Sequence, residues 1–176
     1  LYLDQETAPD EEEQYQCYAE VVRVANGRPV IIRTFDIGGD KPAACFPAAN
    51  EHNPFLGYRA IRMYPDQEAA FRIQLRAILR ASLIGPVKVM IPMIATLGEI
   101  RWVRQLFDQE CQHLQIPEKI PLGIMLEVPS ILFQMAAFCQ EVDFFSVGSN
   151  DLTQYLFAAD RENSKVRHLY DSLHPA

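Results

Sequence analysis

Two acidic side chains follow apolar runs in the second half of the sequence. Glu127 comes directly after the run at 122–126, and Asp151 comes after the run at 143–147 and a glycine turn. Carboxylates at the carboxyl ends of two neighbouring parallel strands can share one hard cation such as Mg²⁺, and substrate oxygens and water complete its coordination. The alternative is that the two acids cap unrelated helices, and the spacing by itself leaves both interpretations open.

Three arginines stand where they could reach the same site. Arg33 ends a β-branched run, Arg59 lies in a loop punctuated by proline and glycine, and Arg161 follows the last strongly apolar segment. Forked guanidinium groups around a metal ion suit a small, strongly anionic, phosphorylated ligand. The alternatives are a surface ion pair between Arg33 and Asp36, and solvated positions for Arg59 and Arg161.

Other polar residues carry weaker signals. The segment Gly38-Gly39-Asp40-Lys41 could offer backbone N–H groups to a phosphate, but a plain turn is commoner and the segment is not a Walker motif. The arginines at i, i+4 and i+8 indicate a solvated helix face: Arg72, Arg76 and Arg80. No ligand or triad spacing links the four histidines, which we expect to be structural or exposed: His52, His113, His168 and His174.

The bulk composition describes one globular domain, which we assign to residues 1–176 with no second domain. The chain has 176 residues, of which 49% are hydrophobic, and a net charge of −7, which argues against a nucleic-acid partner. It has no secretory signal and no apolar run of about 18 residues, so we expect no membrane insertion.

Its four cysteines form no C-x-x-C pair and are expected to be reduced core residues in a cytoplasmic protein. Because it begins at Leu1, we expect a piece of a longer protein.

Strand and helix patterns alternate along the chain. Strands are expected at 30–35, 87–91, 122–126 and 143–147, and helices at 8–24, 66–83, from 97 onward, 130–140, 151–158 and 165–172. Alternation of this kind predicts parallel βα units. Four units do not close an eight-stranded barrel, so we expect part of a (β/α)₈ barrel, with about four βα units, that is incomplete at both ends. An open sheet exposes two edges and the barrel interior, so we expect the isolated chain to aggregate or self-associate.

Several segments taken together closely resemble enzyme I, the phosphoenolpyruvate–protein phosphotransferase of the bacterial sugar phosphotransferase system. The resemblance covers nearly the whole chain, and the order of its segments makes it specific. These segments are Arg33 to Lys41, Asn53 to Arg62, Leu75 to Ser82, Val89 to Ile94 and Gly148 to Tyr155. The last segment would also fit pyruvate phosphate dikinase and phosphoenolpyruvate synthase, whereas the first two favour enzyme I.

The resemblance implies the C-terminal, phosphoenolpyruvate-binding barrel of that family. It implies Mg²⁺ at Glu127 and Asp151, and it places the phosphoenolpyruvate-binding side chains at Arg33, Arg59, Asn150, Asp151 and Arg161. In such enzymes the phosphoryl group passes to a histidine on an N-terminal domain and then to the carrier protein HPr. The family's phosphorylated histidine, its catalytic cysteine and a further arginine match nothing in this chain, so the resemblance implies no catalytic residue here and an inactive fragment. It also implies a homodimer for the full-length protein.

Two other functions stay open. One is a dikinase or synthase type of phosphoenolpyruvate barrel, which would carry a nucleotide-binding domain. The other is a regulatory homologue that binds partner proteins without turnover, although such a protein has no need of the full set of arginine, asparagine and acidic side chains.

Overall fold

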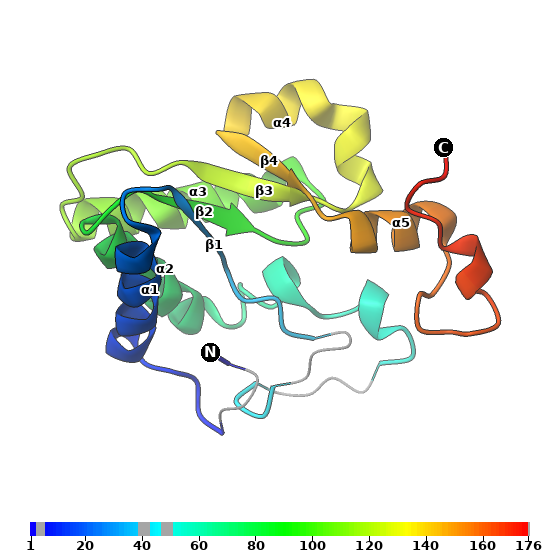
Figure 1. The fold of residues 1–176 in the computed structure, drawn as a ribbon, viewed down its shortest axis with the longest axis horizontal. Helices are drawn as coiled ribbons and strands as arrows, with labels where there is room; N and C mark the ends of the chain where they lie inside the picture. Colours follow the sequence, from blue (N-terminus) through cyan, green and yellow to red (C-terminus); the bar gives the residue numbers. More distant parts are fainter. Residues whose placement is uncertain (3–5, 39–42, 47–50, 176) are drawn as a thin grey trace.

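Four parallel strands form the centre of the fold. The structure, a computed structural model, describes residues 1–2, 6–38, 43–46 and 51–175. The strands pair in chain order in one sheet, with no crossover that reverses the order (Figure 1). They are β1 (Val30–Arg33), β2 (Val87–Ile91), β3 (Leu122–Leu126) and β4 (Phe144–Val147).

Helices follow the strands and cover one face of the sheet. The α-helices are α1 (Glu11–Ala25), α2 (Glu68–Ser82), α3 (Leu97–His113), α4 (Met135–Glu141) and α5 (Ser149–Phe157). Short 3₁₀ helices are η1 (Pro54–Leu56), η2 (Ala60–Arg62), η3 (Pro129–Gln134) and η4 (Arg167–Leu169). Each helix from α1 to α3 contacts the next one along the row, up to α4. A parallel sheet in sequential order with its helices in one row is the arrangement of a (β/α)₈ barrel segment, so this prediction is confirmed.

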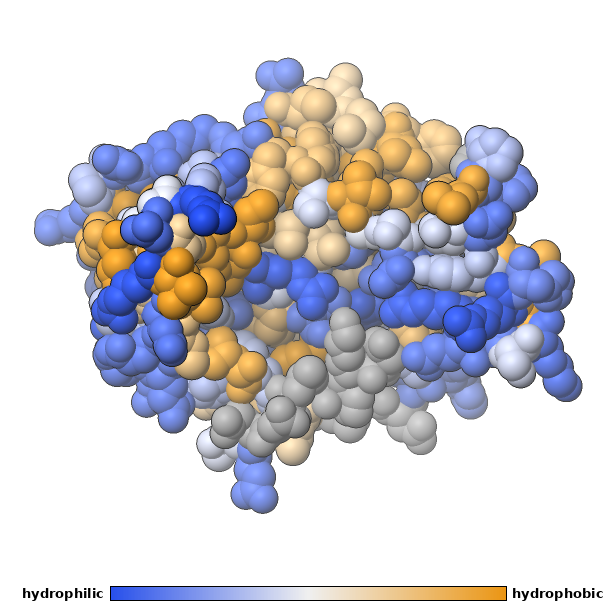
Figure 2. Space-filling model, in the orientation of Figure 1, coloured by the Kyte–Doolittle hydropathy of each residue, from blue (hydrophilic) through white to orange (hydrophobic). Residues whose placement is uncertain are grey.

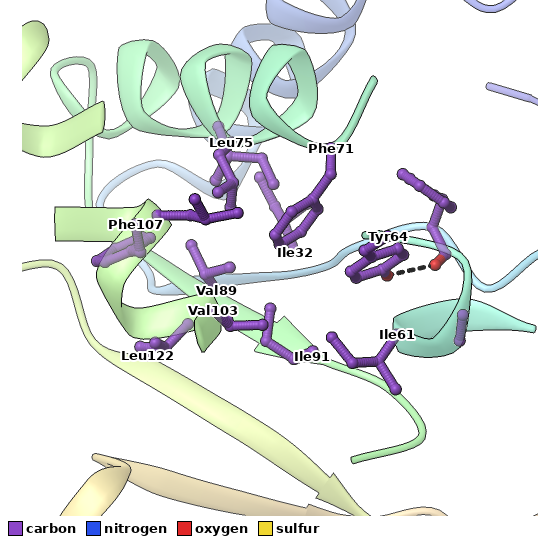
Figure 3. Close-up of a cluster of buried hydrophobic side chains, with 14 of the residues drawn as sticks. Ile32, Ile61, Tyr64, Phe71, Leu75, Val89, Ile91, Val103, Phe107 and Leu122 are labelled. Atoms are coloured by element: carbon purple, nitrogen blue, oxygen red, sulfur yellow. Dashed lines mark hydrogen bonds between the residues drawn. The ribbon is translucent and has the colours of Figure 1, made fainter. Parts of the chain in front are cut away.

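The core lies between the sheet and the helices α2 and α3. Val89 and Ile91 of β2 are fully buried, and Figure 3 shows them meeting Leu75 of α2 and Val103 of α3. Met90, between them on the strand, is less buried because alternate residues of a strand point to opposite faces. The face of the sheet away from the helices is therefore the more exposed one.

Side-chain caps fix the starts of two helices. The Asp10 side chain accepts from the Glu13 N–H and the Glu13 side chain accepts from the Asp10 N–H, which makes a capping box before α1. Thr96 and Glu99 make the same reciprocal pair before α3, as the sequence predicts. Because each box satisfies otherwise orphaned N–H groups, both helices begin at a defined residue.

Three expectations from the sequence are wrong in detail. The segment 165–172 forms only the 3₁₀ turn η4 and no α-helix. The cysteines are free thiols, but Cys17 and Cys139 are exposed rather than part of the core. The arginine stripe of α2 is not simply solvated, because ion pairs join it to the neighbouring helices. Arg72 pairs with Glu110 of α3 at 2.6 Å, and Arg76 pairs with Glu11 of α1 at 2.7 Å.

Candidate functional site

The residues singled out from the sequence converge at the carboxyl end of the sheet. Arg33 is the last residue of β1, Glu127 directly follows β3, and Asp151 lies in the first turn of α5 after β4. Parallel strands all end at this edge, which is why residues about 90 positions apart in the chain meet there. In the view of Figure 2 a band of hydrophilic residues crosses the middle of the molecule.

The most buried ion pair that the structure describes in the site joins Arg59 and Asp36. The Nη2 of Arg59 donates to the two carboxylate oxygens of Asp36 at 3.0 and 2.9 Å, and its Nε donates to Oδ1 at 3.2 Å. Both side chains are 1% exposed. Burial by itself lowers the pKa of Arg59, but the Asp36 carboxylate outweighs burial and raises that pKa above its ordinary value. The solvated position considered for Arg59 is therefore wrong.

Arg33 shares the same carboxylate. Its Nη1 lies 3.2 Å from Oδ2 of Asp36, so the ion pair considered from the sequence is present. The same nitrogen lies 4.0 Å from the sulfur of Met125 on β3. The Arg33 side chain is still 36% exposed, so its guanidinium can face a ligand while Asp36 holds it.

Glu127 is a buried carboxyl group that the surrounding backbone holds in place. The N–H of Met93 donates to its Oε1 at 2.6 Å, and Met93 has a φ of 60°, in the left-handed region that a methionine rarely adopts. Burial raises the pKa of Glu127 to about 7, and the nearby charges of Asp151 and Asp36 add to that rise. A side chain in place of Gly148 would collide with Oε2, so this glycine is needed for the close approach of β4 to Glu127.

Asp151 lies between two arginines. Its Oδ1 accepts from Nη1 of Arg161 at 3.0 Å, and its Oδ2 accepts from Nη2 of Arg59 at 3.4 Å. Its place in the first turn of α5 is favourable for an anion, because unpaired N–H groups lie at the start of a helix. The guanidinium of Arg161 also lies over the ring of Phe55, 5.1 Å from its centre.

Asn150 stands apart from the arginine cluster. It is exposed, and its Oδ1 accepts from the hydroxyl of Tyr170 at 3.1 Å. The structure therefore links Asn150 to the segment after α5, whereas Arg33, Arg59 and Arg161 are linked to one another through Asp36 and Asp151.

The sequence interpretation missed two residues of this site. Asp36 was considered only as a surface partner of Arg33, yet it is buried and anchors two arginines. Tyr155 was read only as part of a motif, yet its hydroxyl reaches both Arg59 and the loop that carries it. The proximity of Asp36 to Arg33 was a usable signal for the first, whereas the contact between Tyr155 and Arg59 spans 96 residues and has no local signature.

The glycine segment after β1 is described only in part. Gly38 has a φ of 99°, and a Cβ at this position would lie 2.5 Å from the carbonyl oxygen of Tyr58 and 2.8 Å from the Cβ of Arg59. Gly38 thus lets the backbone pass directly beside Arg59. Gly39, Asp40 and Lys41 lie outside the described residues, so the phosphate-binding interpretation of this segment stays a prediction.

Two carboxylates are available for a cation. Within the described residues, no group of three or more His, Cys, Asp and Glu side chains could hold a metal ion on its own. The charge of Asp151 adds to the rise in the pKa of Glu127, so the two carboxyl groups lie near each other. An ion bound between them would therefore need further oxygen ligands from a bound molecule or water.

No helix in the described part of the chain has the length and apolar character needed to cross a bilayer.

A barrel segment with arginines and carboxylates at the carboxyl ends of its strands defines a class of α/β protein that binds anionic ligands there. The family model described as "PEP-utilising enzyme, PEP-binding domain" matches residues 1–176. The chain belongs to this family.

Named relatives agree with that assignment and with the resemblance to enzyme I. The chain is 52% identical to multiphosphoryl transfer protein 2 of Escherichia coli, 49% identical to the phosphoenolpyruvate-protein phosphotransferase of Mycoplasma genitalium and 46% identical to that of Staphylococcus carnosus. Each match covers all of this chain but only 22%, 31% and 32% of the relative. The chain therefore spans between about a fifth and a third of the length of these proteins.

Proposed function

We propose that the chain binds phosphoenolpyruvate together with Mg²⁺ as part of a phosphoenolpyruvate–protein phosphotransferase. The observation that carries this proposal is the convergence of Arg33, Arg59 and Arg161 with two carboxylates at one end of the sheet. A dianionic phosphate and a carboxylate on one small molecule call for several fixed guanidinium groups. The family match and the names of the relatives support the same ligand.

The arginines bind and orient the ligand in this proposal. Arg33 and Arg59 face the ligand from β1 and its neighbouring loop, and Asp36 sets their positions before the ligand arrives. Arg161, with Asn150 beside Asp151, closes the site from the α5 side. Fixed guanidinium groups stabilise the negative charge that moves during phosphoryl transfer and the enolate that is left behind.

The properties of Glu127 fit a bound Mg²⁺ ion. Burial raises its pKa, and the charge of Arg59 offsets that rise only in part, so a divalent cation would favour the anion that binds it. Glu127 and Asp151 would hold the ion, and ligand oxygens and water would complete its shell. When bound, Mg²⁺ would neutralise charge on the phosphate and on the developing enolate.

The phosphoryl acceptors lie elsewhere in the proposed protein. By resemblance to enzyme I, a histidine on another domain accepts the phosphoryl group and passes it to HPr in sugar uptake, and the protein works as a cytoplasmic homodimer. Three relatives bear the names multiphosphoryl transfer protein or phosphoenolpyruvate-protein phosphotransferase, which supports this assignment.

Calorimetric titration of the full-length protein with phosphoenolpyruvate, with and without Mg²⁺, tests the proposal. We expect binding that depends on Mg²⁺ and that Glu127→Gln abolishes, because an amide oxygen is a much weaker ligand for a hard cation than a carboxylate. The matched control is Glu118→Gln, because Glu118 is an exposed glutamate before β3, at the opposite end of that strand.

Three outcomes separate the functions. Mg²⁺-dependent binding that survives in Glu118→Gln and is lost in Glu127→Gln supports the proposal. No binding by a well-folded parent overturns it and favours a regulatory homologue that binds partner proteins. Phosphoryl transfer from phosphoenolpyruvate toward a nucleotide instead of a protein histidine would favour a dikinase or synthase.

A further inference from the structure

The hydroxyl of Tyr155 lies at a junction of three parts of the site. It donates to the carbonyl oxygen of Phe55, which belongs to the η1 loop just before Arg59. It accepts from Nη1 of Arg59 at 3.4 Å, and it lies 3.9 Å from the sulfur of Met93, whose N–H holds Glu127. Tyr155 stands one helical turn after Asp151 on α5, so both side chains extend from the same face of that helix.

All three nitrogens of the Arg59 guanidinium donate hydrogen bonds in this arrangement. Asp36 accepts from Nε and Nη2, and Tyr155 accepts from the remaining nitrogen, Nη1. A hydroxyl has one proton and two acceptor lone pairs. Because the proton of Tyr155 is directed to the Phe55 carbonyl, a lone pair is directed to Arg59, and one side chain fixes both the arginine and the loop that carries it.

Tyr155 has both packing contacts and open space around it. The residue is only partly buried, and it lines a cavity of about 300 Å³ between the η1 loop and α5. His52, Leu56 and Ala158 are among the other residues that line this cavity. The ring packs against the core on one side and faces open space on another, and the hydrogen bonds of the hydroxyl add to its packing.

We propose that Tyr155 is a positioning residue for Arg59, whose guanidinium it presets between Asp36 and Asp151. The contact geometry carries this inference, and only its consequence for phosphoenolpyruvate rests on the proposed function. Asp36 balances the charge of Arg59 and holds its Nε and Nη2, and Tyr155 holds the remaining nitrogen, Nη1. Removal of the hydroxyl leaves the charge of the site unchanged but lets the arginine and the η1 loop move.

The test is a double-mutant cycle in the full-length protein with Tyr155→Phe, Arg59→Lys and the combined variant. We expect Tyr155→Phe to raise the dissociation constant for phosphoenolpyruvate with Mg²⁺ about tenfold, the usual effect of losing one hydrogen bond to a charged group. In the Arg59→Lys background the same change should cost less than about twofold, because its effect acts through the guanidinium. Tyr58→Phe is the matched control, since its hydroxyl is in the same loop but bonds to Asp66.

A second readout needs no ligand. Hydrogen exchange of the backbone amides of residues 55–60, followed by mass spectrometry, should speed up in Tyr155→Phe, and this gain should shrink in the Arg59→Lys background. Equal losses of affinity and equal gains in exchange rate in both backgrounds would show a role in loop structure alone and would overturn the proposal. If the parent protein binds no phosphoenolpyruvate, the proposed function fails, and the exchange cycle still decides the role of Tyr155.

Discussion

At the residue scale, the site combines charges that are stable only in one another's presence. Arg59, Asp36 and Glu127 are all nearly inaccessible to solvent. Arg59 and Asp36 neutralise each other, but within the described residues no cationic side chain hydrogen-bonds to Glu127, whose Oε1 accepts from a backbone N–H. Burial therefore disfavours the charged form of Glu127, and the charge of Arg59 offsets this only in part.

Glu127 should make the stability of the protein depend on pH. Its pKa rises from 4.5 to about 7 on folding, so the folded state binds this proton more tightly than the unfolded state does. Its contribution is favourable at low pH and is lost as the pH rises from about 4.5 to about 7. Glu127→Gln, which resembles the protonated form, should therefore stabilise the metal-free protein at pH 8 by on the order of 3 kcal/mol and change little at pH 4.5.

Denaturant unfolding of both proteins at pH 4.5 and pH 8 without Mg²⁺ measures this difference, with Glu118→Gln as the charge-matched control. Equal stability of the parent and Glu127→Gln at pH 8 would contradict a raised pKa for Glu127.

Asp36→Asn should be costly for the fold. The change leaves the buried guanidinium of Arg59 without its bidentate counter-ion. Loss of one partner of a buried ion pair destabilises a protein by about 3–5 kcal/mol. Thermal unfolding measures the effect. Asp66→Asn is a milder control, because Asp66 accepts from the Tyr58 hydroxyl and forms no ion pair within the described residues. A melting temperature within about 1 °C of the parent would contradict the anchoring role of Asp36.

At the element scale, turns rather than strands decide where the chemistry lies. The β4–α5 turn passes Gly148 directly against Glu127, and the turn after β1 passes Gly38 against Arg59. Each glycine marks a place where two segments approach more closely than any side chain allows. The sheet brings the site residues to one edge, and these close approaches set how near their side chains lie to one another.

Gly148→Ala should disrupt the site while leaving the fold intact. The added methyl group collides with the Glu127 carboxylate and displaces it from Asp151. We expect Mg²⁺-dependent ligand binding to weaken at least tenfold, measured by calorimetry, because an ion is sensitive to small displacements of its ligands. The control is Gly98→Ala in α3, where the nearest atom to the new methyl group lies 3.8 Å away and alanine favours the helix. Unchanged binding in Gly148→Ala would separate Glu127 from the ligand site.

The sequence predicts most of these elements and fewer of their contacts. Apolar periodicity and the Thr96–Glu99 capping box identify the four strands and the longer helices, because those signals are local. The prediction of a helix at 165–172 is wrong because a short polar stretch carries no packing signal. The segment forms only η4. The positions of Arg59 and Asp36 depend on a contact between residues 23 positions apart in the chain, which periodicity does not describe.

At the scale of the whole molecule, the sheet has two edges, and no helix of the described residues covers one of its faces. β1 and β4 are the outer strands of the order β1-β2-β3-β4. Ile31, Val147 and Phe133 are 50%, 64% and 87% exposed. Figure 2 shows apolar residues gathered on the upper part of the molecule, over the region of α4. Exposed strand edges and apolar patches of this kind promote association.

Residues 1–176 in isolation should therefore self-associate. Analytical ultracentrifugation over a tenfold range of concentration should show dimers or larger species. Phe133→Ser should reduce their proportion, because the Phe133 side chain is aromatic and 87% exposed. Cys17→Ser, at an exposed polar position on α1, is the control. A monodisperse monomer at every concentration would contradict this expectation.

The most direct test of the proposed function is a crystal structure of the full-length protein with phosphoenolpyruvate and Mn²⁺ as an anomalous substitute for Mg²⁺. We expect one anomalous peak between Glu127 and Asp151, and the phosphate of the ligand against Arg33, Arg59 and Arg161. A ligand bound away from the carboxyl end of the sheet, or an ion that contacts neither carboxylate, would contradict the proposed site.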